Sequence, residues 1–182
     1  SNINSPYPDF SPFIPEDESY LVFTSRRKGN RGNLMDYDGL FTSDVYMSFV
    51  KGGIFDNAQN LSIHNTEADE EAAGISPDGN NILVFVDDVY QNIFGNIYIA
   101  SKKGKSFQPL ISIGENVNTS TSIETAASLT PGNKLLYFAS DRAGGYGGTD
   151  LYVSNRLPDG EWGLPLNLGS EINTKYNEDY PS

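Results

Sequence analysis

The stretch LLYFASDRAGGYGGTDLY, residues 135–152, decides the fold because its pattern occurs three times in the chain. An apolar strand is followed by a polar loop and then by a short strand with a central tyrosine. The pattern recurs at residues 82–98 (ILVFVDDVYQNIFGNIY) and at residues 21–46. A repeat of about 50 residues is typical of propellers and other repeat arrays. The sequence therefore predicts three copies of one structural unit.

Other residues recur with the same period. The first strand of the pattern is marked by Phe23, Phe85 and Phe138, and the second by Tyr46, Tyr98 and Tyr152. An aromatic residue follows each tyrosine, at Phe55, Phe107 and Trp162. An Asn-Ser or Asn-Thr pair separates the units and begins at Asn4, Asn65, Asn118 and Asn173.

Each unit reads as four short strands. In the second unit we expect strands at residues 70–76, 82–86, 96–100 and 107–113, with a Pro77-Asp78-Gly79 turn and a hairpin at residues 102–105. The two middle strands are apolar without polar alternation, which indicates burial on both faces. No helical periodicity persists. The unit is predicted to be an antiparallel meander that packs against its neighbours.

The predicted fold class is all-β: a β-propeller of four-stranded antiparallel blades. Residues 1–62 would form blade 1 with its entering linker, residues 63–115 blade 2, and residues 116–170 blade 3. Residues 171–182 would be a linker and the first-strand stub of a next blade. Closed propellers usually have about four to eight blades, so we expect part of a larger propeller of about six blades.

Composition excludes several functions. The 182 residues include 12 Lys and Arg against 24 Asp and Glu, a net charge of −12 that argues against nucleic-acid binding and against docking on anionic lipid. No apolar run is long enough to cross a membrane, and no signal peptide is evident. The chain has no cysteine, which excludes disulfides and thiolate chemistry.

The residues described so far resemble the PD40 repeat, a WD40-like propeller repeat of the TolB type. The resemblance rests on Ser76-Pro77-Asp78-Gly79 and on the run from Ser140-Asp141-Arg142 to Thr149-Asp150-Leu151-Tyr152. With residues 162–169 (WGLPLNLG) and 172–174 (INT), that run resembles Bacteroidota outer-membrane proteins with an OmpA-type peptidoglycan-binding domain. One such group belongs to the type IX secretion and gliding machinery. Unit one departs in its Pro15-Glu16-Asp17 turn, and unit two has Asp87-Asp88 where Ser-Asp-Arg is expected.

The resemblance implies a non-catalytic scaffold in the periplasm, associated with the outer membrane through parts outside this chain. Its partner would be an envelope protein, and a glycan or peptidoglycan fragment is the alternative. Function is expected on the end of the blades that carries the loops after each second strand, at residues 26–38, 87–92 and 141–150, together with the linkers. The candidate binding residues there are Arg26, Arg27, Arg31, Asp87, Asp88, Asp141, Arg142 and Tyr146.

Two features of the longest loop have alternative interpretations. The basic cluster of Arg26, Arg27, Lys28 and Arg31 would contact an acidic partner or would pair with the neighbouring acidic linkers. Asp36-Tyr37-Asp38-Gly39 has the opening of a calcium loop, but Met47 stands where an EF-hand needs glutamate. Calcium is the only cofactor the sequence raises, with Asp36 and Asp38 as candidate ligands.

Catalysis has little support in the sequence. Glu67, Asp69, Glu70 and Glu71 could supply paired carboxylates for glycoside hydrolysis, but acids so close together also fit a solvated linker. His64 is the only histidine and has no cysteine or recurring serine partner. Tyr146 stands between two Gly-Gly pairs, which predicts exposure in a loop whose backbone adopts positive φ.

Overall fold

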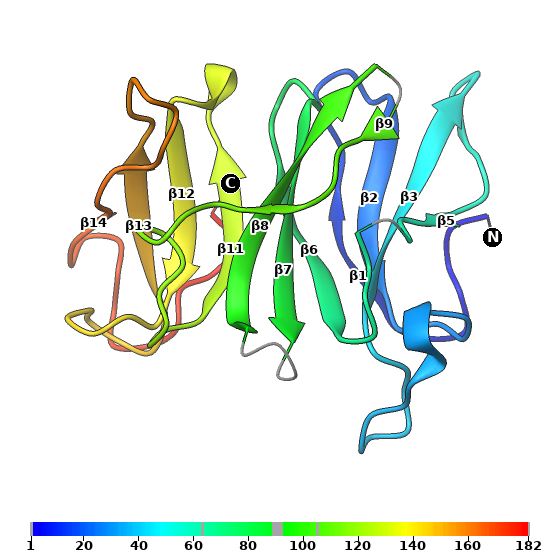
Figure 1. The fold of residues 1–182 in the computed structure, drawn as a ribbon, viewed down its shortest axis with the longest axis horizontal. Helices are drawn as coiled ribbons and strands as arrows, with labels where there is room; N and C mark the ends of the chain where they lie inside the picture. Colours follow the sequence, from blue (N-terminus) through cyan, green and yellow to red (C-terminus); the bar gives the residue numbers. More distant parts are fainter. Residues whose placement is uncertain (1, 63, 89–92, 105, 182) are drawn as a thin grey trace.

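The computed structural model describes residues 2–62, 64–88, 93–104 and 106–181. Three antiparallel sheets stand side by side along the molecule in chain order (Figure 1). The predicted all-β propeller-blade architecture is confirmed. The only helical segments in the described residues are short 3-10 turns, which include η1 (Arg31–Asn33) and η3 (Pro131–Asn133).

Each sheet is a meander whose strands follow one another in space as in sequence. The first sheet contains β1 (Asp9–Phe13), β2 (Tyr20–Ser25), β3 (Asp44–Lys51), β4 (Ile54–Phe55) and β5 (Gln59–Asn60). The second contains β6 (Asp69–Ile75), β7 (Asn81–Asp88), β8 (Ile93–Lys103), β9 (Ser106–Phe107) and β10 (Ile111–Ser112). The third contains β11 (Glu124–Leu129), β12 (Leu135–Ser140), β13 (Asp150–Asn155) and β14 (Leu166–Asn167).

The outermost strand is interrupted, which the sequence did not predict. In blade 2, β9 and β10 both pair with β8, and residues 108–110 between them belong to neither strand. Pro109 lies in this gap and has no N–H to donate. In blade 3, an isolated bridge between Arg156 and Trp162 precedes β14, with Pro165 between them. Short, broken edge strands resist pairing with other chains.

The register corrects one of the sequence markers. Phe23 pairs with Tyr46 and Phe138 pairs with Tyr152, but in blade 2 Tyr98 pairs with Val84. Phe85 is therefore one residue beyond the equivalent position and points to the opposite face of its sheet. Blade 2 keeps the tyrosine of the pair and replaces the phenylalanine by valine.

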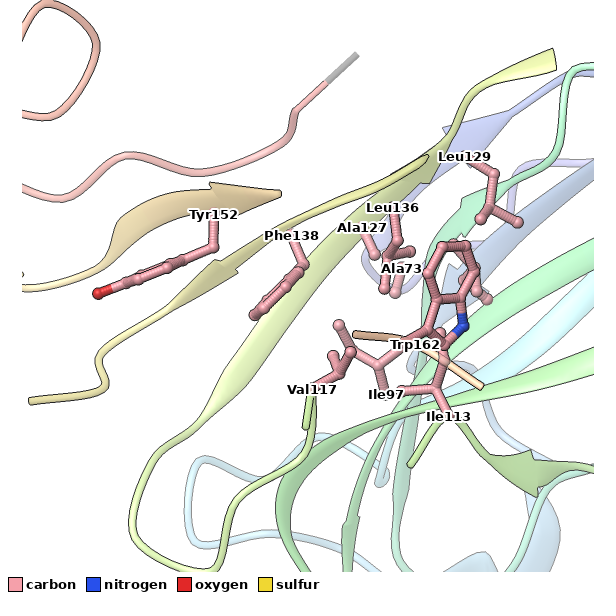
Figure 2. Close-up of a cluster of buried hydrophobic side chains, with 11 residues drawn as sticks. Ala73, Ile97, Ile113, Val117, Ala127, Leu129, Leu136, Phe138, Tyr152 and Trp162 are labelled. Carbon is pink, nitrogen blue, oxygen red and sulfur yellow. The ribbon is translucent and has the colours of Figure 1, made fainter. Parts of the chain in front are cut away.

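The cores lie between the blades, because the middle strands bury both faces. Between blades 1 and 2, Tyr20 and Val22 pack against Ile82 and Val84. Between blades 2 and 3, Leu83 and Ile97 pack against residues that include Leu136, Phe138 and Trp162 (Figure 2). A smaller cluster of Leu21, Phe23 and Tyr46, on the other face of blade 1, is covered by Ile3, Phe55 and Ala58 of the same chain.

Adjacent blades touch most closely at their innermost strands. A Cβ atom added to Gly74 of β6 would lie 1.9 Å from the carbonyl oxygen of Ala127 in β11. Between blades 1 and 2, the Tyr20 hydroxyl donates to the Gly79 carbonyl at 3.1 Å. Gly79 has a φ of +67° in its turn, as the Pro-Asp-Gly motif predicts.

Turns and loops separate to opposite ends of the sheets. Figure 1 shows η3 and the hairpin between β8 and β9 at the upper end, and the connections β2–β3 and β12–β13 at the lower end. The lower end is called the loop end below. Residues 89–92 of the predicted β7–β8 loop, and Lys105 of the predicted hairpin, lie outside the described residues. No helix in the described residues is long and apolar enough to cross a membrane.

Candidate functional site

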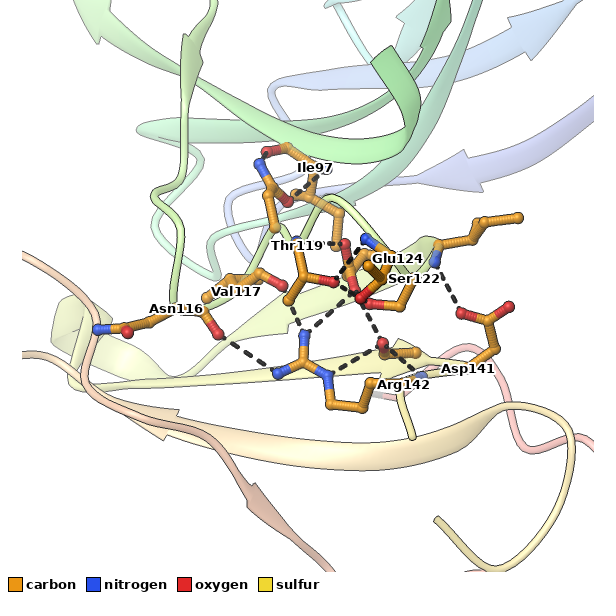
Figure 3. A network of polar contacts seen from close by, with 12 residues as sticks. Ile97, Asn116, Val117, Thr119, Ser122, Glu124, Asp141 and Arg142 are labelled. Atoms are coloured by element: carbon orange, nitrogen blue, oxygen red, sulfur yellow. Dashed lines mark hydrogen bonds and ion pairs between the residues drawn. The ribbon is translucent and has the colours of Figure 1, made fainter. Parts of the chain in front are cut away.

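Arg142 holds blade 3 together instead of facing outward. Its guanidinium lies 4.8 Å from the ring centre of Phe138 and 5.0 Å from that of Tyr152. It donates to Glu124 Oε1 at 3.1 Å, and also to Ser140 Oγ and to the linker carbonyls of Asn116 and Val117 (Figure 3). Glu124 is fully buried, so the arginine neutralises a carboxylate that has no access to water.

Arg27 occupies the same position in blade 1. Its guanidinium lies 5.4 Å from the ring centre of Phe23 and 4.4 Å from that of Tyr46. It contacts Asp9 Oδ1 at 2.7 Å, Ser25 Oγ at 2.7 Å and the Ile3 carbonyl at 2.8 Å. Arg27 and Arg142, both predicted as binding residues, therefore make intramolecular contacts that secure the start of each blade to its middle strands.

Blade 2 has no arginine at this position. Val86 pairs with Glu70 as Ser140 pairs with Glu124, which places Asp88 where the other blades have Arg27 and Arg142. The Glu70 carboxylate is fully buried and accepts hydrogen bonds from the backbone N–H and the hydroxyl of Thr66. Burial raises the pKa of Glu70 to about 7. Asp88, another predicted binding residue, is 5% exposed and lies inside the blade.

The linker asparagines clamp each third strand. Asn65 bonds the N–H and C=O of Val45, Asn118 those of Ile97, and Asn173 those of Leu151. The following Thr or Ser hydroxyl bonds an acid that begins the next blade, in the pairs Thr66–Glu70, Thr174–Glu178 and Ser5–Asp9. The recurring Asn-Thr and Asn-Ser pairs are therefore structural connectors.

Arg26 and Arg31 of the long loop also bond within the chain. Arg26 pairs with Asp36 at 2.7 Å and with Asp38 at 2.6 Å. Arg31 donates to the Ser62 carbonyl, and its backbone N–H donates to Asp44. The acidic partners of Arg26 lie in its own loop, whereas the sequence suggested the adjoining linkers. The calcium prediction for Asp36 and Asp38 stays untested, and here both carboxylates converge on a guanidinium.

Asp141, Tyr146 and Asp87 differ in their surroundings. Asp141 accepts the backbone N–H of Ile123 at 2.7 Å. Tyr146 is 53% exposed, while its backbone N–H donates to the buried carboxylate of Asp150 at 2.6 Å. Asp87 lies at the end of β7, directly opposite Asp69 of β6. Tyr146 and Asp141 are exposed and Asp87 is partly buried, and the prediction that these residues bind a ligand stays untested.

The prediction of positive φ holds for one of the four glycines beside Tyr146, and the others have a different cause. Only Gly144 of the four has positive φ, at +92°. A Cβ at Gly147 would lie 2.1 Å from the Tyr176 carbonyl oxygen, and one at Gly148 would lie 1.9 Å from Asn177 Oδ1. Close packing of residues 174–178 on the loop requires these glycines, and it fixes the loop that presents Tyr146.

The clustered acids and the histidine are divided among separate environments. Asp69 accepts the N–H and hydroxyl of Ser43, Glu70 is buried on Thr66, and Glu67 is exposed. His64 is 3% exposed, and its ring nitrogens have no hydrogen-bond partner among the described residues. His64 directly precedes Asn65 as Val117 directly precedes Asn118 in the next linker. His64 is therefore the equivalent of Val117, which is buried in the core between blades 2 and 3.

The loop end also carries exposed apolar residues that were not predicted from the sequence. In the long loop, Leu34 is 42% exposed, Met35 60% and Tyr37 104%. Four further apolar residues around the same end are between 42% and 67% exposed: Phe94, Ile123, Ile172 and Tyr176. The available signal was the run Leu34-Met35 inside a polar, glycine-containing loop, where no strand needed apolar residues.

Comparison with known proteins identifies the fold but no family. No family model matches the sequence, and no curated protein sequence matches it. The structure is similar to TolB from Acinetobacter baumannii, with a TM-score of 0.57 and 17% identity over 90% of this chain and 33% of that chain. The fold is therefore that of TolB-type β-propellers.

Two enzyme structures share this likeness. A puromycin hydrolase matches with a TM-score of 0.56 and 13% identity, over 94% of this chain and 23% of that chain. A prolyl endopeptidase matches with a TM-score of 0.52 and 11% identity, over 86% of this chain and 19% of that chain. This chain spans at most one third of the length of any of these three proteins. At such identities the similarity concerns the fold alone, and function has to be argued from the site.

Proposed function

We propose that this chain is a non-catalytic propeller scaffold that binds a protein partner through its loop end. One observation carries the proposal: large apolar side chains are exposed on loops that ion pairs and hydrogen bonds hold in place. Met35 and Tyr37 lie in a loop tied by Arg26, and Tyr146 in one tied by Asp150. Aromatic residues and methionine are enriched in protein interfaces, and rigid presentation lowers the entropy cost of binding.

The proposed setting is the periplasm of a Gram-negative cell envelope. Support comes from the TolB-type fold together with the PD40-like motifs at residues 76–79 and 140–152. On the resemblance of residues 140–174, we further propose membership of an outer-membrane and peptidoglycan-associated assembly like the type IX secretion and gliding machinery. Any OmpA-type domain and any membrane anchor would lie in parts of the protein outside this chain.

Site-specific photocrosslinking tests the proposal. A benzophenone amino acid is placed at Tyr37 or Tyr146 on the loop end, and as a matched control at Ile54, which is 70% exposed in the β3–β4 hairpin at the other end. In the envelope of the native host, the two loop-end probes are expected to give one common protein adduct that the Ile54 probe does not give. Equal adducts from all three positions, or none from the loop end, would contradict the proposal.

A glycan-binding module is the second candidate, and the exposed ring of Tyr146 favours it. An aromatic face on a fixed loop can stack on a sugar ring, and the loop is held by two backbone bonds to Asp150. Soluble peptidoglycan fragments should then quench tyrosine fluorescence in the wild type and not in Tyr146→Ala. Absence of binding by the wild type would remove this candidate.

A further inference from the structure

A cavity opens at the loop end between blades 1 and 2. It has a volume of about 370 Å³. Its walls come from the long loop (Leu34, Met35, Asp36 and Thr42), from the linker into blade 2 and the start of β6 (Glu67, Ala68 and Asp69) and from Asp87 at the end of β7. Three segments distant in sequence thus place four acidic residues around one hollow.

The negative charge in this cavity has little internal compensation. Asp69 and Asp87 are direct cross-strand partners, an arrangement that like charges disfavour. Burial, followed by the charge of Asp69, raises the pKa of both Asp36 and Asp87. Among the described residues, Arg26 is the one basic side chain that forms an ion pair with an acid of the cavity. It binds Asp36, and also Asp38 in the same loop.

Thr42 provides an observation independent of charge. It lines the cavity and is 6% exposed, and its Oγ1 has no hydrogen-bond partner among the described residues. A buried hydroxyl without a partner costs free energy, and a bound molecule that hydrogen-bonds to it would remove that cost. A hydroxyl beside carboxylates can accept a hydrogen bond from an N–H donor.

The wall of the cavity distinguishes between possible cations. No group of three or more acidic, His or Cys residues in the described part of the chain is placed to hold a metal ion. Leu34 and Met35 instead add an apolar wall beside the acids. Long basic side chains pack their methylene stems on apolar surface and keep their charged ends on polar groups. The combination suits arginine or lysine better than a bare ion.

We propose that this cavity receives an arginine or lysine side chain of a basic segment in the protein partner. The stem would lie along Leu34 and Met35, and the charged end would lie among Asp69, Asp87 and Glu67. The inference rests on the proposed function, since it names the chemistry of the partner that the loop end binds. The net charge of −12 favours approach of such a segment from a distance.

Titration of the isotope-labelled chain with tetra-arginine amide at low ionic strength tests the inference. Amide shifts are expected to concentrate at residues 35–36, 67–69 and 87. The isosteric, uncharged tetra-citrulline amide should cause none. The double variant Glu67→Gln/Asp87→Asn is expected to bind about tenfold more weakly. Thr42→Val, which removes the hydroxyl with little change of shape, should stay folded and bind about threefold more weakly.

The matched control is Glu115→Gln/Glu171→Gln, which changes the net charge equally at exposed linker carboxylates outside the cavity. It should leave the affinity within about twofold of the wild type. Equal weakening by both double variants, equal binding of both peptides, or no binding of tetra-arginine would overturn the inference. Calcium chloride giving the same shifts at matched ionic strength would also overturn it, in favour of a metal site. Loop-end crosslinks without tetra-arginine binding would overturn this inference and leave the proposed function standing. Tetra-arginine binding without loop-end crosslinks would contradict the proposed function and leave only a cavity that accepts basic side chains.

Discussion

At the scale of the residue, one position per blade decides how a buried carboxylate is neutralised. Arg27 and Arg142 stack on an aromatic pair and neutralise Asp9 and Glu124, whereas blade 2 has Asp88 and leaves Glu70 to the hydroxyl and N–H of Thr66. Removing one member of a buried ion pair is costly because the other charge stays buried alone. The blades should therefore respond differently to equivalent substitutions.

For Arg142→Met we expect a loss of about 3 kcal/mol in the free energy of unfolding, because Glu124 would lose the one basic partner it has among the described residues. Urea denaturation at pH 7.5 measures it. Adding Glu124→Gln to the same chain should restore part of the loss, and a double-mutant cycle isolates the pair. Strict additivity of the two substitutions would show that the two side chains do not stabilise each other.

Glu70 predicts an unusual pH dependence of stability. Its folded pKa of about 7 lies above the reference value of 4.5, so the folded state binds the proton more tightly than the unfolded state. The contribution of Glu70 to stability is complete below pH 4.5 and is lost as the pH rises towards about 7. Glu70→Gln should be more stable than wild type at pH 8, by about 1–3 kcal/mol, and nearly equal to it at pH 4.5. Chemical denaturation at both pH values measures the difference, and a difference that does not change with pH would contradict the assignment.

At the scale of the element, Gly74 sets how closely two blades approach. A methyl group there would overlap the Ala127 carbonyl, so Gly74→Ala must push β6 away from β11. We expect a loss of about 3 kcal/mol, at the upper end of overpacking effects. Gly163→Ala is the control, because its Cβ would meet the Asn155 carbonyl at an ordinary 3.4 Å. Thermal unfolding of both variants compares them, and equal melting temperatures would mean that the contact between the inner strands is loose.

The repeat predicted the fold because a period shared by strand, turn and aromatic residues leaves few other architectures. It failed where one blade departs from its neighbours. Val84 replaces the phenylalanine of the Phe–Tyr pair, and the nearby Phe85 gave a false register. The outer strands are interrupted at Pro109 and Pro165. The missing N–H of proline is evident from the sequence, but its effect depends on whether the strand lies at the edge of the sheet.

The candidate site was less predictable than the fold. The prediction that Arg27 and Arg142 bind a partner stays untested, and their recurrence at equivalent positions is also what a structural contact requires. The acidic cavity could not be found in the sequence, because Asp36 of blade 1 comes near Asp69 and Asp87 of blade 2 only when the two blades pack. The one local signal of the cavity was the presence of acids at strand positions that face each other, Asp69 and Asp87.

At the scale of the whole molecule, stability should vary along the row of blades. Blade 2 is packed on both faces, whereas blades 1 and 3 each share one large core with a neighbour. In repeat arrays each unit is stabilised mainly by its neighbours, so the central unit opens last. Amide hydrogen exchange should therefore be slowest in β7 and β8, and faster in β2, β3, β12 and β13.

Phe138→Ala tests this directly, because the side chain is fully buried between blades 2 and 3 and its loss should cost about 3–5 kcal/mol. If the blades behave as coupled units, exchange should accelerate most in β12 and β13, less in β7, and least in β2 and β3, which lie two blades away. Exchange followed by mass spectrometry of peptides from each blade measures this gradient. A uniform acceleration across all three sheets would instead mean that the blades open together as one cooperative unit, in which case the loop end of blade 1 could not stay ordered while blade 3 opens.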